Sequence, residues 1–492
     1  MVTKSRFRGQ YLLTDANIPK KFSNWESESI TDEFDFYHSP DLQSSMVNKN
    51  GTRILCAGYI FDPLNPQQTN EQVLNKICGD ITSGKNIFDV LSIFGGRYIL
   101  FVDDGNNQLV IPDAGALRSI LYGSFNGYSV VTSSTKLALT LFDTTIQTTP
   151  SKEKYIEQAD YWIGTGTDDD RLSRVLANHF LDLADMSKSR MPHYPPSQKS
   201  PVPYSAEILS GSIEALACRF ETPHIWLSGG LDSRTILSAS KSVSDQCRYI
   251  VFDRPDVPEH DIEIPRRLCE KLGLNLTVVE PEPISDSFRY RLNNEFCSPR
   301  YSSAISNVEW YDDIEANVVP TTGIISEVAR TYYEHPYKPF SPGLCIELSN
   351  IPDTDYSRQQ LNRWIESARE YERKTNIDIF DLFYWEQKVS TWGARSAREL
   401  DLVCDLAAPF SNRELLHTLL TTSRDRRRYP YTIYKGIIEE CWSACLEEPI
   451  NHLPNPTIKK SIEKYISEKS NHSLPYHIIS NIYKKFRFTG PD

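Results

Sequence analysis

Short apolar runs rich in β-branched and aromatic residues dominate the first third of the chain. Gly, Asn and Asp lie between four of these runs, at 53–62, 95–104, 108–115 and 128–134. This pattern predicts strands that are joined by hairpin turns. Helical periodicity appears among them at 70–81, so we expect a β-rich domain over 1–150 with one helix.

The pattern changes after residue 150. Helical pieces and then a Pro-rich stretch fill 151–205, a composition typical of a linker. From 206 onward, strand-like runs at 224–228, 247–253 and 276–283 alternate with helical segments at 206–220, 233–243 and 261–275. Such alternation predicts βαβ units and a parallel sheet with right-handed crossovers. Beyond about 299 the periodicity is mostly helical, so 206–492 is predicted to be an α/β domain with many helices.

Composition narrows the classes of protein that fit. The chain has 492 residues, 39% of them apolar and 24% charged, as expected of a soluble globular protein of two or three domains. No apolar run is long enough for a membrane span, and the first residues lack the apolar core of a signal peptide. A formal charge of −12 argues against a nucleic-acid partner, and ten dispersed cysteines without a CxxC pair fit a reduced, cytoplasmic protein.

One motif carries specific chemistry. The hexapeptide SGGLDS, residues 228–233, lies between a predicted strand and a predicted helix. Gly229 and Gly230 let the backbone approach a ligand, while Ser228, Ser233 and the amides of the helix N-terminus offer hydrogen bonds to an anion. Asp232 would be repelled by phosphate unless a divalent cation joined the two. The loop is therefore a candidate cradle for pyrophosphate and Mg2+, and it lacks the GKS/GKT signature of a Walker A loop.

The loop and four further segments resemble the asparagine synthetase-like family of ATP-pyrophosphatases. SGGLDS resembles the family's pyrophosphate loop, and the segments GGRY (95–98) and PDAGALR (112–118) resemble hairpins of its N-terminal amidotransferase-like domain. The segment TGIISE (322–327) is similar to the family's SGEGADE, and DLAAPFSNR (405–413) is similar to its E-x-R-x-P-F-L-D. The segments occur in the family's order from about 50 to 460.

The resemblance implies an N-terminal domain of the Ntn-hydrolase type, followed by an ATP-pyrophosphatase domain. It also implies an ATP-dependent, AMP-forming ligase that activates a carboxylate as an acyl-adenylate and passes it to a nitrogen nucleophile. The cofactors would be ATP and Mg2+, with Asp232 and Glu327 holding the metal. The implied ATP-binding residues are Leu227, Ser228, Gly229, Gly230, Asp232, Ser233, Val251, Thr322 and Gly323.

The chain departs from the family at two places. Glutamine-using members expose an N-terminal cysteine as the nucleophile, whereas Val2, Thr3 and Lys4 follow Met1 here and the first cysteine is Cys56. Glutaminase activity is therefore not expected, and ammonia would come from solution or from a separate glutaminase. Ile324 stands where asparagine synthetases carry Glu and β-lactam synthetases carry Tyr, and an isoleucine cannot transfer a proton.

Four residues are candidates for the catalytic roles that the resemblance implies. Asp405 matches the family's other acidic position and would act as a base, although it equally fits a turn before Pro409. Lys459 or Lys460 would stabilise charge on the acyl-adenylate, and the alternative is a solvated basic tail. Arg330 lies one helical turn after Glu327 and would reach a phosphate or a carboxylate, or else form a surface ion pair with Glu327.

The substrate and the reaction partner stay open. The carboxylate would be a small molecule or linked to a glycan, as in enzymes that amidate sugar acids of surface polysaccharides, and the nucleophile would be ammonia or an amine. Relatives of this type also cyclise peptides or form β-lactams. An idle synthetase-like scaffold would explain Ile324 and the missing cysteine, and a tRNA-modifying pyrophosphatase would share the loop but usually brings a basic surface or catalytic cysteines.

Overall fold

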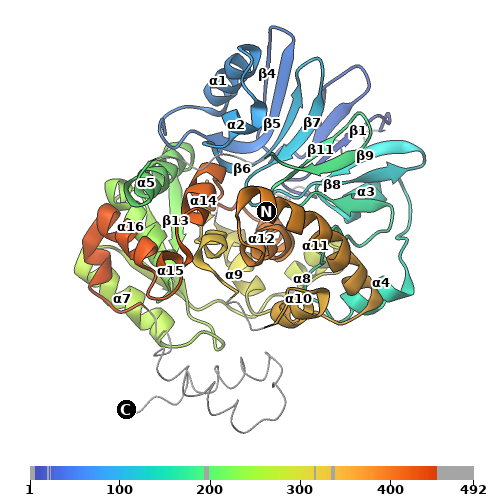
Figure 1. The fold of residues 1–492 in the computed structure, drawn as a ribbon. Helices are drawn as coiled ribbons and strands as arrows, with labels where there is room; N and C mark the ends of the chain where they lie inside the picture. Colours follow the sequence, from blue (N-terminus) through green and yellow to red (C-terminus); the bar gives the residue numbers. More distant parts are fainter. Residues whose placement is uncertain are drawn as a thin grey trace.

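The N-terminal half of the protein is a sandwich of two antiparallel sheets. The structure is a computed structural model that describes residues 6–18, 22, 24–192, 199–314, 317–333 and 338–450. Each sheet has six strands, in the orders β10-β8-β9-β1-β3-β2 and β12-β11-β7-β6-β5-β4 (Figure 1). The strands are β1 (Tyr11–Thr14), β2 (Glu26–Ser29), β3 (Asp35–His38), β4 (Ser44–Lys49), β5 (Thr52–Phe61), β6 (Gly95–Asp103), β7 (Gln108–Pro112), β8 (Leu121–Phe125), β9 (Tyr128–Thr132), β10 (Leu172–Arg174), β11 (His179–Asp182) and β12 (Ser187–Arg190).

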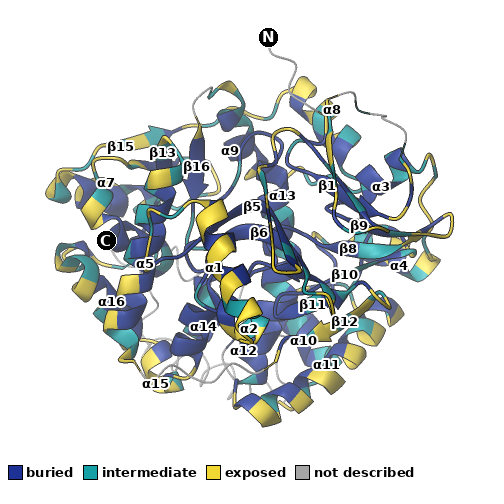
Figure 2. Ribbon diagram, turned by 90° about the horizontal axis from the view of Figure 1, so that it is seen from above, coloured by how far each residue is buried: buried dark blue, intermediate teal, exposed yellow. Residues whose placement is uncertain are grey.

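Apolar side chains hold the sandwich together in layers. Leu13 and Phe36 of one sheet pack with Leu55 and Phe101 of the other in one buried cluster. Helix α1 (Asn70–Thr82) covers the outer face of the β5–β6 sheet, and α3 (Thr135–Leu141) covers the outer face of the other. Figure 2 shows the inner strands buried and one side of α1 exposed. The predicted helix at 70–81 and the four predicted strands are confirmed.

Two parts of the predicted organisation need correction. The sandwich includes four strands from the first fifty residues, which carry no clear alternation in the sequence. The segment 151–205 is not only helical pieces and linker, because β10 pairs with β8 and β11 pairs with β7. These strands are three or four residues long, too short to show a period of two. Helix α5 (Pro201–Arg219) also starts inside the Pro-rich stretch, with Pro201 at its first turn.

A four-stranded parallel sheet forms the centre of the second half. Its order is β15 (Leu276–Val279), β14 (Arg248–Phe252), β13 (Thr222–Trp226) and β16 (Val318–Thr321). The chain runs from β13 outward to β15 and then returns to place β16 on the other side of β13. The parallel sheet is thus confirmed, while β16 is a strand in the region that was expected to be mostly helical.

Helices surround this sheet and extend beyond it. Helices α5 and α6 (Leu231–Ala239) contact β13, and α7 (His260–Leu272) contacts β14 and β15. None of the helices in the described part combines the length and apolar character of a membrane span. The remaining helices are α2 (Ile87–Leu91), α4 (Pro150–Ile156), α8 (Asp286–Glu295), α9 (Ile305–Trp310), α10 (Pro342–Ser349), α11 (Asp355–Thr375), α12 (Ile379–Phe383), a π-helix (Tyr384–Gly393), α13 (Ala394–Leu400), α14 (Arg413–Leu420), α15 (Arg424–Arg427) and α16 (Thr432–Trp442).

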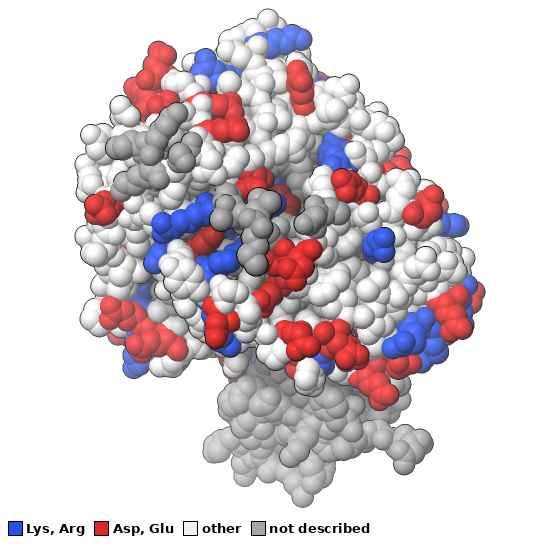
Figure 3. Space-filling model, turned by 180° about the vertical axis from the view of Figure 1, so that it is seen from behind, with Lys and Arg blue, Asp and Glu red and all other residues white. Residues whose placement is uncertain are grey.

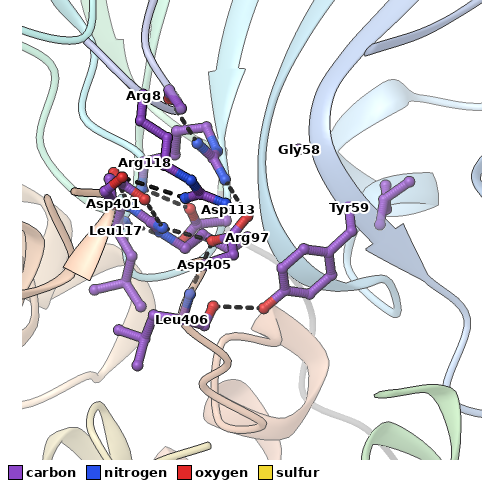
Figure 4. Close-up of polar contacts among 12 residues, drawn as sticks. Arg8, Gly58, Tyr59, Arg97, Asp113, Leu117, Arg118, Asp401, Asp405 and Leu406 are labelled. Atoms are coloured by element: carbon purple, nitrogen blue, oxygen red, sulfur yellow. Dashed lines mark hydrogen bonds and ion pairs between the residues drawn. The ribbon is translucent and has the colours of Figure 1, made fainter. Parts of the chain in front are cut away.

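A buried cluster of ion pairs joins the two halves (Figure 4). Arg97 of β6 contacts Asp401 at 2.5 Å and Asp405 at 2.6 Å, and Arg118 contacts Asp405 at 2.7 Å. The Arg97 and Arg118 side chains are 1% and 2% exposed. The cluster fixes the segment after α13 against the sandwich, because each charge in it depends on a partner from the other half.

We predict that Arg97→Gln lowers the free energy of unfolding by about 3–5 kcal/mol, because it leaves the buried Asp401 carboxylate without its cation and Asp405 with Arg118 alone. Urea denaturation followed by circular dichroism measures the change. The matched control is Arg358→Gln, since Arg358 pairs with Asp353 and both side chains are 51% exposed. This control should cost less than about 1 kcal/mol. Equal losses in the two variants would contradict the role of the cluster.

Candidate functional site

The SGGLDS loop lies at the carboxyl edge of the parallel sheet, where the order of the strands reverses. It follows β13 and leads into α6, and the segment 322–327 follows the neighbouring strand β16. The next strand along the chain, β14, pairs with one edge of β13, and β16 pairs with the other edge, so the carboxyl ends of β13 and β16 form a topological switch point. Ligands bind at this position in open α/β sheets. The topology therefore places the two predicted ATP-site segments together.

Hydrogen bonds within the loop define its shape. Ser228 donates its amide to Ser233 Oγ at 3.1 Å, and Gly230 donates its amide to Ser228 Oγ at 3.2 Å. Gly230 is the N-cap of α6, and no side chain caps this helix. The α6 N-terminus thus presents amides and the positive end of the helix dipole, which favour an anion.

A carboxylate already contacts one amide of the loop. Gly229 donates its amide to Asp261 Oδ1 of α7 at 3.0 Å. The contact shows that this amide is oriented toward an anionic acceptor. Asp261 was not predicted from the sequence, because nothing in the α7 sequence marks a residue that meets a loop 32 positions earlier.

Asp232 is held by the segment that follows β16. Ser326 donates its hydroxyl to Asp232 Oδ1, and Arg330 Nη2 contacts Asp232 Oδ2 at 2.8 Å. Gly323 lies directly against Asp232, since a Cβ built on Gly323 would be 2.8 Å from the Asp232 Cβ. The pyrophosphate loop and the TGIISE segment thus form one site.

Arg330 bridges the two predicted metal ligands. The same Nη2 atom that contacts Asp232 contacts Glu327 Oε1 at 3.1 Å, and Tyr384 donates its hydroxyl to Glu327 Oε2. Burial raises the pKa of the Glu327 carboxyl and the Asp232 charge adds to this shift, while Arg330 opposes it. Two carboxylates that share one cation fit Mg2+ chemistry, in which protein carboxylates and phosphate oxygens complete the ligand set. Within the described residues no group of three or more His, Cys, Asp or Glu forms a metal site.

The backbone of this segment is strained. Ile325 has φ of 82° and Thr331 has φ of 50°, a left-handed conformation that β-branched residues rarely adopt. The Ile325 side chain is fully buried and lies against Gly115 of the sandwich, where a Cβ on Gly115 would be 2.5 Å from Ile325 Cδ1. Strain of this kind persists only where the surroundings impose it, and it concentrates at functional sites.

The contacts of Asp405 favour a structural role over the predicted catalytic one. Both of its carboxylate oxygens accept hydrogen bonds from arginines of the sandwich. Burial opposes its ionisation, but Arg118 and Arg97 outweigh burial and lower the pKa of Asp405 to about 2. A carboxylate with so low a pKa is a weak base at neutral pH. The catalytic assignment stays a prediction.

The other predicted residues have mixed outcomes. Leu227 follows β13 and Val251 lies in the adjoining strand β14, and their contact with adenine stays a prediction. Thr322 donates its amide to the Ala407 carbonyl at 3.0 Å. Lys459 and Lys460 lie outside the described residues.

Cys56 is fully buried, and burial raises the pKa of its thiol to about 12, so it is no nucleophile at neutral pH.

Lys388 is a site residue that the sequence did not indicate. It lies one turn after Tyr384 in the π-helix, and its Nζ is 4.2 Å from the ring centre of Tyr161 and 5.1 Å from that of Trp392. Burial lowers the pKa of Lys388 to about 8, although the negative charges of Glu327 and Asp160 oppose the shift. In the sequence Lys388 lies between Trp385 and Trp392, a spacing typical of a core helix that does not mark the lysine as a site residue.

Comparison with known proteins yields distant structural similarities only. No protein-family pattern matches the chain, and no curated protein does so. Glutamine phosphoribosylpyrophosphate amidotransferase from B. subtilis, complexed with ADP and GMP, is 13% identical over 66% of this chain and 71% of its own, with a TM-score of 0.24. An allosteric regulatory enzyme of purine biosynthesis is 13% identical over 67% and 87%, with a TM-score of 0.25.

A glutamine-dependent NAD+ synthetase from Acinetobacter baumannii, in complex with ADP, is 14% identical over 49% of this chain and 60% of its own. Its TM-score is 0.20. Scores this low carry no inference about the fold or the activity of the present chain.

We predict that Gly323→Ala weakens ATP binding at least tenfold, because the added Cβ must displace Asp232 from the loop. Isothermal titration of ATP in the presence of Mg2+ measures the change. Gly343→Ala is the matched control, since Gly343 has open space around its Cβ position and lies in the first turn of α10. Unchanged affinity in Gly323→Ala would contradict the placement of the site.

Proposed function

We propose that the protein is an ATP-dependent, AMP-forming ligase that joins a carboxylate to a nitrogen nucleophile as an amide. The observation that carries this proposal is the SGGLDS loop at the reversal point of the parallel sheet, with Asp232 and Glu327 on one shared cation. A glycine loop, an uncapped helix N-terminus and two carboxylates suit a metal-bound pyrophosphate.

In the proposed reaction, the substrate carboxylate attacks the α-phosphate of ATP. A carboxylate oxygen–phosphorus bond forms, and the bond from the α-phosphorus to the bridging oxygen breaks. Pyrophosphate leaves with that oxygen, and the nitrogen nucleophile then displaces AMP from the acyl-adenylate. The loop amides and the α6 N-terminus bind the β- and γ-phosphates, and Mg2+ held by Asp232 and Glu327 would neutralise their charge.

Arg330 has a defined place in this proposal. In the structure its guanidinium pairs with both Asp232 and Glu327, and these two carboxylates raise the pKa of Arg330 despite burial. A cation between the carboxylates prevents their mutual repulsion before the nucleotide arrives. Once phosphate and metal bind, the same guanidinium lies close enough to the loop to contact a phosphate oxygen.

Lys388 is a candidate for the lysine that stabilises charge on the acyl-adenylate. It is mostly buried and interacts electrostatically with Glu327, so its charge acts where little water screens it. Lys459 and Lys460 stay alternative candidates.

The carboxylate substrate is proposed as a class only: a sugar acid, free or glycan-linked, an amino acid or a peptide. The nucleophile is ammonia or an amine, and a separate glutaminase would supply ammonia. A nucleic-acid partner remains unexpected, and the face in Figure 3 has acidic and basic side chains interspersed without a continuous basic surface. Cyclisation of a peptide and an idle scaffold are the alternatives.

We predict that ATP turnover yields AMP and pyrophosphate, because the loop binds the two terminal phosphates as a unit. Carboxylate-dependent exchange of labelled pyrophosphate into ATP, measured across uronic acids, amino acids and peptides, detects the adenylate. Asp232→Asn should lower the exchange rate at least a hundredfold, since it removes the metal–phosphate anchor. The matched control is Asp256→Asn, because Asp256 is an exposed carboxylate in the loop after β14.

Three outcomes separate the alternatives. ADP and phosphate as products would rule out adenylation. A protein that binds no ATP at all would favour the idle scaffold. Exchange that is equally lost in Asp256→Asn would show that the effect of Asp232→Asn is not specific to the site.

A further inference from the structure

A small cavity lies between the two halves of the protein, apart from the proposed ATP site. Its volume is about 80 Å³. The sandwich contributes the loop before β8, the segment between β9 and α3, and β10; the other half contributes residues 295–298 and the helices around 391–398. None of the residues of the SGGLDS loop or of the 322–327 segment lines it.

Cations outnumber carboxylates in the wall of this cavity. The cationic side chains are Lys136, Arg174, Arg395 and Arg398, and the carboxylates are Asp168 and Glu295. Both carboxylates accept hydrogen bonds from neutral donors, Asp168 from Ser298 Oγ at 2.8 Å and Glu295 from the Phe7 amide at 3.1 Å, and their charges also act on Arg174 and Arg398. Arg395 pairs with Glu399, just outside the wall, at 3.5 Å. The cavity therefore keeps a small excess of positive charge.

Arg398 is buried and forms no ion pair with a described carboxylate, although the charges of Glu295 and Asp401 act on it. The residue is 7% exposed, and no carboxylate of the described residues lies within 4 Å of its guanidinium. Its Nη2 donates to the Glu295 carbonyl at 3.0 Å and its plane lies 4.5 Å from the Phe296 ring centre, but Nε and Nη1 have no hydrogen-bond partner. A buried guanidinium with two unused donors is costly unless an anion takes them.

Arg174 repeats this arrangement on the opposite wall. Its Nη1 donates to Ser119 Oγ at 3.1 Å, its Nε has no partner, and no carboxylate of the described part forms an ion pair with it. Burial lowers the pKa of Arg174 to about 10 and the charge of Arg395 adds to the shift, while Asp168 and Tyr356 oppose it. Thr135 Oγ1, also in the wall, is a further buried polar atom without a partner.

We propose that this cavity binds a small oxyanion, a phosphate or a carboxylate, between Arg174 and Arg398. The guanidinium fork matches the paired oxygens of either group, and Thr135 supplies a hydroxyl. The volume is that of several water molecules, which suits inorganic phosphate or a short carboxylate and excludes a nucleotide. Because both halves contribute an arginine, the bound anion would hold them together. The site does not depend on the proposed ligase activity.

The experiment measures the thermal midpoint of the full chain with sodium phosphate, sodium acetate or sodium chloride at equal ionic strength and pH. We expect phosphate or acetate to raise the midpoint above its value in chloride with saturable dependence, and the comparison of the two identifies the preferred oxyanion. Arg174→Gln and Arg398→Gln should each raise the apparent Kd for the preferred oxyanion at least tenfold. Arg254→Gln, a change at an ion pair with Asp256 outside the cavity, is the matched control and should leave the Kd unchanged.

The Arg398→Gln variant is compared with the wild type only if its circular dichroism spectrum is native. If it does not fold, the test uses Arg174→Gln, which changes a less buried residue. Equal midpoints in all three salts for the wild type would overturn the proposal. An oxyanion effect that persists at full strength in a folded Arg174→Gln variant would overturn it as well.

Discussion

The buried ion pairs of Arg97 and Arg118 with Asp401 and Asp405 are the constraint on which the rest of the structure depends. Two guanidinium groups inside the sandwich need carboxylates, and the second half supplies both from the turn after α13. Neither half can leave the other without exposing unpaired buried charge. The cluster thus makes the sandwich part of the architecture of the second half.

This constraint extends to the proposed ATP site through the backbone. Ala407, two residues after Asp405, donates its amide to the Pro320 carbonyl of β16 and accepts the amide of Thr322. The strand that leads into Gly323 and Ser326 is therefore positioned by a segment that the sandwich holds. The Ile325 side chain packs against Gly115 of the sandwich, and this contact helps to explain how a β-branched residue keeps a positive φ there.

The sequence allowed the pyrophosphate loop, the parallel sheet and the longer strands to be predicted, because each has a local signal: a glycine motif or a clear period. Strands β10–β12 and β16 escaped prediction since they are three or four residues long and gain stability from neighbours distant in the chain. The same holds for side chains. Ser326, Tyr384 and Lys388 reach the site through tertiary contacts, and the assignment of Asp405 as a base ignored two arginines about three hundred residues earlier.

The most direct test of the proposed ATP site is a crystal structure of the protein with Mg2+ and a non-hydrolysable ATP analogue. We expect the β- and γ-phosphates on the amides of Gly229 and Gly230, the metal beside Asp232, and the Asp261 side chain turned away from the loop. A nucleotide bound elsewhere would contradict the proposed site. So would a fully occupied analogue that leaves the Gly229–Asp261 hydrogen bond intact and has no metal beside Asp232.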